Sequence, residues 1–108
     1  MTEYIQVLTT VDGEEKAKEL QRLLVEHRAA ACVQVLGPIS STYWWEGQIE
    51  ETKEWMCLAK TQATQYGRLE SLVKENHPYS VPEILALPIV TGNEEYLAWV
   101  KAETTAQA

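Results

Sequence analysis

The sequence has no phenylalanine, only two histidines, and few basic residues, with nine Lys and Arg against 16 Asp and Glu. The formal charge of -7 would be repelled by phosphate backbones and anionic lipid, so neither nucleic acid nor a membrane surface is an expected partner. No apolar run approaches the roughly 20 residues that span a bilayer, and residues 1–4 lack a basic segment leading into an apolar one. We therefore expect a cytoplasmic protein.

Cysteine is also scarce, which excludes a framework of several disulfides. Cys32 and Cys57 lie in two apolar stretches joined by a turn at Glu46–Gly47. If these stretches form a hairpin, opposite residue numbers sum to about 93, so Cys32 would face Thr61 and Cys57 would face Leu36. The thiols would then be about 13 Å apart along the strands, too far for a disulfide. We expect two free thiols, as in a reducing compartment.

Long polar tracts, internal repeats and linkers are absent as well. With 45% hydrophobic and 23% charged residues, the composition is that of an ordinary globular protein. A length of 108 residues suits a single domain, which we predict over 1–108. The tail at 104–108 has little to anchor it and is expected to fray.

The periodicity of apolar residues predicts the order strand, helix, strand, strand, helix, strand, with one extra helix at the end. The elements are expected at about 4–11, 12–27, 31–45, 49–61, 66–76, 83–91 and 94–101. This order is that of an α+β, ferredoxin-like βαββαβ sandwich, here with an unusually long central hairpin and an additional C-terminal helix.

Local signals refine these elements. Asp12 with Glu15 three residues later predicts a capping box at the start of the first helix. Gly37–Pro38 predicts a kink in the long second strand, and residues 46–48 are expected to turn the chain back toward the next strand. Pro88 removes one donor from its strand, which places the fourth strand at a sheet edge or beside a bulge.

The strands do not alternate cleanly between apolar and polar residues. Segments 31–33, 55–59 and 84–87 put apolar side chains on both faces of the predicted sheet. Two helices cover only one face, and the last helix can cover only part of the other. We therefore expect subunits to bury sheet surface against each other, although the symmetry does not follow from this argument.

Four stretches together resemble the CutA divalent-cation-tolerance family. They are 31–35 (ACVQV), 41–47 (STYWWEG), 54–61 (EWMCLAKT) and 77–84 (HPYSVPEI). The resemblance covers nearly the whole chain, with departures at Gln34, where the family more often has Asn, and at Ser80, where it more often has Glu. It implies a tight homotrimer with hairpins exchanging edge contacts, and a proposed role in tolerance of copper and other divalent metal ions.

By this resemblance, the metal ligands are Cys32, His77 and Glu83. The three side chains would approach one another either within one chain or across a subunit boundary. A thiolate, an imidazole and a carboxylate suit a copper ion, and also zinc or other divalent cations. Spacing alone does not show that they converge. Cys32 could instead be a small core residue, His77 part of a rigid loop, and Glu83 the partner of a backbone amide or a lysine.

Other residues favour structural roles. His27 at the end of the first helix suits a cation at the helix C-terminus. The aromatic residues at 43–45 are expected to bury area between subunits, and Lys60 is expected to pair with Glu54 or Glu50.

An enzyme is not expected, because the sequence has no Gly-rich phosphate loop or nucleophile elbow, and Cys32 with His77 is the only local nucleophile and base. The alternative function is a signalling trimer that binds a small molecule or a protein in clefts between subunits, lined by groups such as Arg28, Lys60 and Tyr79. A third possibility is a structural partner for another protein.

Overall fold

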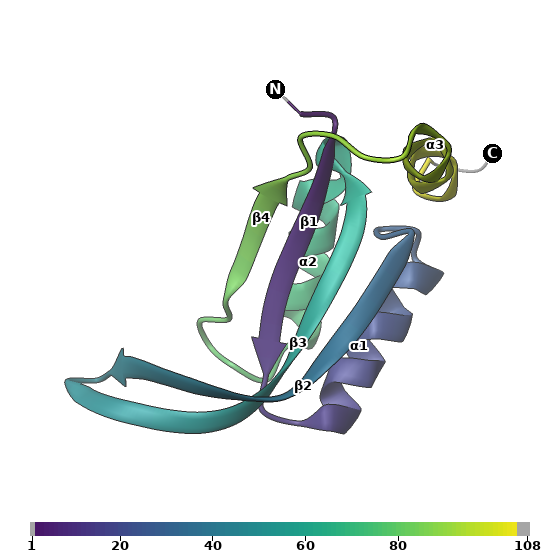
Figure 1. The fold of residues 1–108 in the computed structure, drawn as a ribbon. Helices are drawn as coiled ribbons and strands as arrows, with labels where there is room; N and C mark the ends of the chain where they lie inside the picture. Colours follow the sequence, from purple (N-terminus) through teal and green to yellow (C-terminus); the bar gives the residue numbers. More distant parts are fainter. Residues whose placement is uncertain (1, 106–108) are drawn as a thin grey trace.

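The computed structural model describes residues 2–105 and shows an α+β fold with one four-stranded antiparallel sheet and three α-helices (Figure 1). The strands are β1 (Tyr4–Val11), β2 (Cys32–Trp45), β3 (Gln48–Gln62) and β4 (Ile84–Pro88). The helices are α1 (Glu14–Glu26), α2 (Tyr66–Asn76) and α3 (Glu94–Glu103), with a 3-10 turn at Ala63–Gln65. The elements follow the predicted order, and no helix within 2–105 is long and apolar enough to cross a membrane.

The sheet has the strand order β2-β3-β1-β4, so β4 lies at an edge as Pro88 predicts. Helices α1 and α2 lie together behind one face of the sheet (Figure 1). Alternate residues of β1, such as Ile5 and Val7, point to this side and join Leu20 of α1 and Leu69 of α2 in the core. The core therefore lies between the two helices and one face of the sheet.

The start of α1 differs from the prediction. Gly13, not Asp12, occupies the N-cap position, and no side chain caps the helix, so the expected capping box with Glu15 is wrong. The helix begins at Glu14, so Asp12 lies one residue too early to bond the first-turn amides. Glu14 and Glu15 in the first turn still interact favourably with the positive end of the helix dipole.

The hairpin turn lies at Glu46–Gly47 as expected, and Gln48, which was expected to belong to the turn, is the first residue of β3. Glu46 and Gly47 both have positive φ angles, 51° and 80°, as a type I′ turn requires, and Gln48 pairs with Trp45. The numbers of paired residues in β2 and β3 sum to 93 from the turn as far as the pair Ile39 and Glu54, as predicted.

A bulge between Leu36 and Ile39 then shifts the register by one residue. Cys32 therefore faces Lys60 rather than Thr61, and Cys57 faces Val35 rather than Leu36. The expectation of two free thiols is confirmed.

The C-terminal part is better anchored than expected. Asn93 caps α3 by accepting a hydrogen bond from the Tyr96 amide at 3.0 Å. Thr104 is buried, and its side chain accepts a 2.9 Å hydrogen bond from Gln62 Nε2. The prediction that the tail frays from residue 104 is therefore wrong for Thr104. The remainder of the predicted tail, 106–108, lies outside the described residues. The fourth strand is also shorter than predicted, ending at Pro88.

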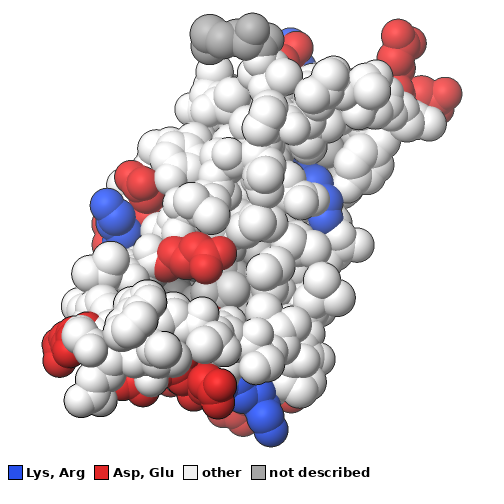
Figure 2. Space-filling view, turned by 60° about the vertical axis from the view of Figure 1, so that its left-hand side comes forward, with Lys and Arg blue, Asp and Glu red and all other residues white. Residues whose placement is uncertain are grey.

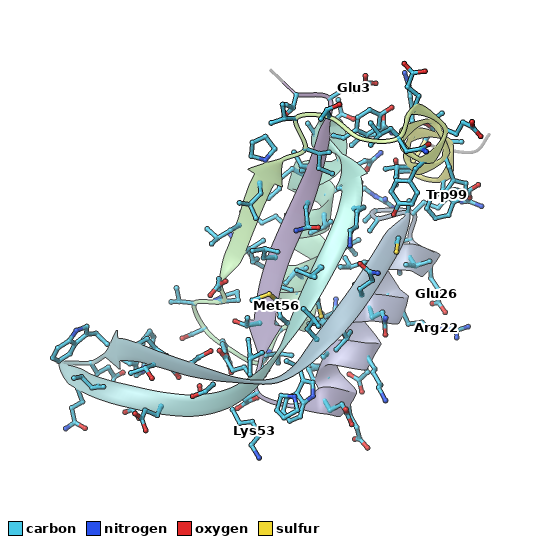
Figure 3. All side chains as sticks on the ribbon, in the orientation of Figure 1. Glu3, Arg22, Glu26, Lys53, Met56 and Trp99 are labelled. Carbon is cyan, nitrogen blue, oxygen red and sulfur yellow. The ribbon has the colours of Figure 1, made fainter. Side chains whose placement is uncertain are left out.

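The second face of the sheet is covered by neither α1 nor α2 (Figure 1). We call it the open face, and its apolar side chains include Leu8, Leu36, Met56, Leu58, Leu85 and Leu87. Met56 is labelled on it in Figure 3. Leu36 and Leu85 are each more than half exposed. Figure 2 brings the β4 side of the molecule forward and shows a mostly uncharged surface, with acidic atoms just left of the middle and basic atoms to the right. The chain thus presents an apolar sheet face to its surroundings.

Candidate functional site

A pocket of about 340 Å³ lies where the hairpin bends away from the sheet. Asp12 reaches it from the end of β1, Glu54 from β3, and Glu83 from the segment that leads into β4. No Lys, Arg or His side chain lines it. The pocket therefore has an acidic lining, supplied by three segments that are distant in sequence.

Aromatic rings form much of the remaining wall. Tyr43 and Trp45 project into the pocket from β2, and Tyr79 from the loop after α2. Trp44 does not line the pocket and is 72% exposed, since neighbouring residues of a strand point to opposite faces. The three rings predicted as one cluster at 43–45 are thus divided between two surfaces.

Glu54 is the most deeply placed acid of the pocket, with only 5% of its surface exposed. Its Oε2 accepts a 2.8 Å hydrogen bond from the Tyr79 hydroxyl. Burial, followed by the bond to Glu54 and the charges of Glu54 and Asp12, raises the pKa of Tyr79, so this hydroxyl stays protonated at neutral pH. The expected pairing of Glu54 or Glu50 with Lys60 is wrong, because Lys60 Nζ donates to Oε1 of Gln34.

His77 connects the loop after α2 to β1. Its Nδ1 accepts a 3.1 Å hydrogen bond from the Tyr79 amide, which assigns the proton to Nε2, 2.8 Å from the carbonyl oxygen of Thr10. The imidazole also packs edge-on against the Tyr79 ring, with centroids 4.7 Å apart. Both ring nitrogens are thus engaged, and His77 holds Tyr79 in place at the pocket. A metal ion on His77 would have to displace one of these bonds.

Cys32 lies at the other end of the sheet. Cys32 pairs with Lys60 of β3, which in turn pairs with Gln6 of β1. His77 instead contacts Thr10, four residues after Gln6 in β1. Four residues of strand span about 13 Å, so Cys32 and His77 are well separated. Cys32 is instead near Tyr96 of α3, whose pKa is raised by burial and then by Cys32.

Within one chain, the predicted ligands are therefore not brought together. Glu83 lines the pocket on the His77 side of the molecule, without Cys32. Within residues 2–105, no three His, Cys, Asp or Glu side chains are grouped closely enough to hold a metal ion. A site that uses all three predicted residues requires ligands from more than one copy of the chain.

The residues proposed to line an effector cleft are also dispersed. Arg28 pairs with Glu103 of α3 at 2.9 Å, Lys60 bonds to Gln34, and only Tyr79 reaches the pocket. His27 is exposed at the end of α1, with Nδ1 3.0 Å from the Leu23 carbonyl oxygen, which fits its structural interpretation.

The two thiols should differ sharply in reactivity. Burial raises the pKa of Cys57 to about 11, and the side chain has no exposed surface, whereas Cys32 is partly exposed. At pH 8 only about one Cys57 thiol in a thousand would be ionised. We expect one fast-reacting thiol per native chain with a disulfide reagent and two after denaturation. Fast reaction of both thiols in the native protein would contradict this environment for Cys57.

Sequence reasoning missed Glu54 and Asp12 as parts of a common pocket. One signal was present, because Glu54 has the same strand parity as Met56 and Leu58 and so places an acid beside two apolar residues on one face of the sheet. The contribution of Asp12 depends on where the hairpin bends, which no local pattern specifies.

Comparison with known proteins identifies the family. The model of the CutA1 divalent ion tolerance protein family matches residues 5–103. The Divalent-cation tolerance protein CutA of Thermus thermophilus is 46% identical over 98 residues, which are 91% of this chain and 95% of that protein. Protein CutA of Homo sapiens is 44% identical over 95 residues, which are 88% of this chain but 53% of the human protein.

Solved structures agree with the sequence matches. The Thermus thermophilus Cut A1 structure superimposes with a TM-score of 0.92 at 44% identity, over 94% of this chain and 99% of that one. The Oryza sativa CutA1 structure gives a TM-score of 0.94 at 39% identity, over 98% and 97%. Related proteins are named as chloroplastic in rice and periplasmic in Archaeoglobus fulgidus, so the similarity selects no single compartment. On this evidence, the chain belongs to the CutA1 divalent ion tolerance family.

Proposed function

We propose that the chain acts in the cytoplasm as a ferredoxin-like homotrimer that binds divalent metal ions, copper foremost, with Cys32, His77 and Glu83 as ligands contributed by different copies. The open face is the observation that carries this proposal. Leu36, Leu85 and their apolar neighbours would leave a large unfavourable surface on a monomer. Packing of copies through this face would both bury it and place Cys32 of one copy among residues of another.

The chemistry of the three ligands supports the choice of metal. A thiolate and an imidazole favour copper over hard cations such as magnesium, and a carboxylate adds negative charge. Cys32 is partly exposed and unpaired, so its thiol is accessible, while Cys57 is buried within the core. Both cysteines being free also fits a reducing compartment such as the cytoplasm.

We propose binding rather than catalysis as the role. The nucleophile and base considered from sequence, Cys32 and His77, are about 13 Å apart along the strands of one chain. A nucleophile needs its base within hydrogen-bond reach.

The oligomeric state is tested by light scattering after size-exclusion chromatography. A homotrimer has a mass of about 37 kDa, three times the 12.3 kDa of the chain. Leu85→Glu places a charge on the open face at the β4 edge and should shift the protein toward smaller species. The matched change on the opposite surface, Val25→Glu on α1, should leave the trimer intact. A wild-type mass of one chain would overturn the assembly.

Metal binding is tested by anaerobic titration with copper and zinc. We expect saturation at about one ion per chain, with Cys32→Ser and His77→Ala each removing the saturable component, because a soft site loses most of its affinity with one ligand. His27→Ala is the control, since it removes an exposed imidazole that bonds within its own helix and is not among the proposed ligands. Saturable binding that survives both substitutions would rule out these ligands, and equal loss in His27→Ala would indicate diffuse surface binding.

A further inference from the structure

We propose that Lys60 of one copy forms an ion pair with the partner subunit's Glu54, at the acidic end of the open face. This inference rests on the assembly proposed above, and it names the polar contact that aligns one copy on the next. The pair uses none of the three proposed metal ligands, so it can be tested in metal-free protein.

Lys60 is a cation on the open face without a carboxylate partner. Its position in β3 has the same parity as Met56 and Leu58, so its side chain lies on that face. Its ammonium group donates to Oε1 of Gln34, and no ion pair within residues 2–105 includes Lys60. A copy that covers the open face removes water from this charge, which is unfavourable unless a carboxylate takes the place of the solvent.

Glu54 is the complementary charge at the other end of the same face. Only 5% of its surface is exposed, and its Oε2 accepts a 2.8 Å hydrogen bond from the neutral hydroxyl of Tyr79. In the part of the chain that the structure describes, no ion pair includes Glu54. Asp12 and Glu83 add negative charge around it. A carboxylate with so little exposed surface is normally matched by a cation.

One chain cannot form this pair by itself. Lys60 follows Glu54 in β3 by six positions, which is about 20 Å along an extended strand. A lysine side chain is much shorter than this distance. The two charges can meet if the Lys60 end of one open face lies against the acidic end of the next.

The charges also select the alignment of the copies. Packing that places equivalent ends of two open faces together would bring Lys60 to Lys60 and Glu54 to Glu54, which is repulsive. Contact between unlike ends is attractive, and a closed ring of three requires such a head-to-tail contact.

The proposed metal site requires the same alignment. Cys32 is in register with Lys60, and Glu83 lines the acidic pocket. A packing that brings Cys32 of one copy to the pocket of the next therefore brings Lys60 there as well.

The test is a double-mutant cycle on subunit exchange in buffer containing EDTA. Unlabelled and isotopically labelled trimers of the full chain are mixed, and native mass spectrometry gives the rate at which mixed trimers form. Lys60→Gln and Glu54→Gln should each accelerate exchange at least ~10-fold, because each leaves one covered charge unpaired. The double variant should exceed the faster single variant by less than ~3-fold, since both charges are then gone.

Lys53→Gln is the matched control. It makes the same change in β3 at an exposed lysine of the hairpin, labelled in Figure 3, and should alter exchange less than ~2-fold. Additive effects of the two substitutions, or equal acceleration by Lys60→Gln and Lys53→Gln, would overturn the proposal.

A second measurement keeps the proposal testable if Glu54→Gln unfolds, as judged by circular dichroism. Carbodiimide treatment of wild-type trimers that mix labelled and unlabelled chains joins an amine to a carboxylate in contact with it. We expect a product that links Lys60 of one chain to Glu54 of another, and the absence of any product between chains at Lys60 would contradict the pair. Coupled exchange rates without saturable metal binding would retain the ion pair and reject the ligand set, and the opposite result would reject the ion pair alone.

Discussion

Replacing Leu69 by alanine should lower the free energy of unfolding by about 3–5 kcal/mol, the largest stability change we expect from one core substitution. Leu69 has no exposed surface and lies in the core shared by α1, α2 and the sheet, together with Leu20. Truncation removes buried apolar area and leaves a cavity that the rigid sheet cannot collapse to fill. Urea unfolding monitored by tryptophan fluorescence measures the difference at fixed protein concentration, since assembly contributes to stability.

Val25→Ala is the matched control for this change. Val25 is a helical aliphatic residue of α1, but 42% of its surface is exposed. Its truncation should change the free energy of unfolding by no more than about 0.5 kcal/mol. Similar losses from Leu69→Ala and Val25→Ala would mean that α2 does not pack on the sheet as described.

Gly37→Ala should destabilise the protein by about 1–3 kcal/mol, although it adds a single methyl group. A Cβ at this position would lie 2.6 Å from Cγ of Trp55, whose ring packs against the core. The ring cannot move without disturbing that packing, so either β2 or Trp55 must shift. Chemical denaturation of the variant measures the loss.

Gly67→Ala provides a control of opposite sign. Nothing lies within 4 Å of a Cβ at Gly67, which is in the first turns of α2. Alanine there should stabilise the protein by about 0.5–1 kcal/mol, because the unfolded chain loses conformational freedom. A neutral or stabilising Gly37→Ala would show that the close approach of β2 to Trp55 is not as described.

Elements marked by strong periodicity were predictable from sequence, and those set by tertiary geometry were not. The helical spacing of apolar residues placed the first helix, whose buried residues are Ala17, Leu20 and Leu24, and Pro88 predicted an edge strand. For residues 32–36, which precede Gly37–Pro38, the predicted pairing with β3 was wrong by one residue. Gly37–Pro38 predicts a kink but does not reveal whether a bulge shifts the pairing register. Asp12 failed as a cap because the helix begins at Glu14 with Gly13 in the cap position, a shift of one residue that local signals did not resolve.

For the candidate site, sequence identified residues of chemical interest but not their surroundings. Glu83 was named as a ligand and does line the acidic pocket. His77 was considered either as a ligand or as part of a rigid loop, and nothing in the sequence showed that both of its nitrogens bond within the chain. Whether Cys32 meets His77 of another copy depends on how copies pack, which is a property of the assembly.

The central claim, a metal site shared between copies, is tested most directly by subunit complementation. Cys32→Ser and His77→Ala chains are unfolded together, refolded as mixed assemblies, and titrated anaerobically with copper. If Cys32 of one copy and His77 of its neighbour form the site, random mixing restores about one quarter of the wild-type sites, although neither variant alone has any. Recovery of no sites from well-mixed, folded trimers would contradict a shared site and with it the proposed ligand set.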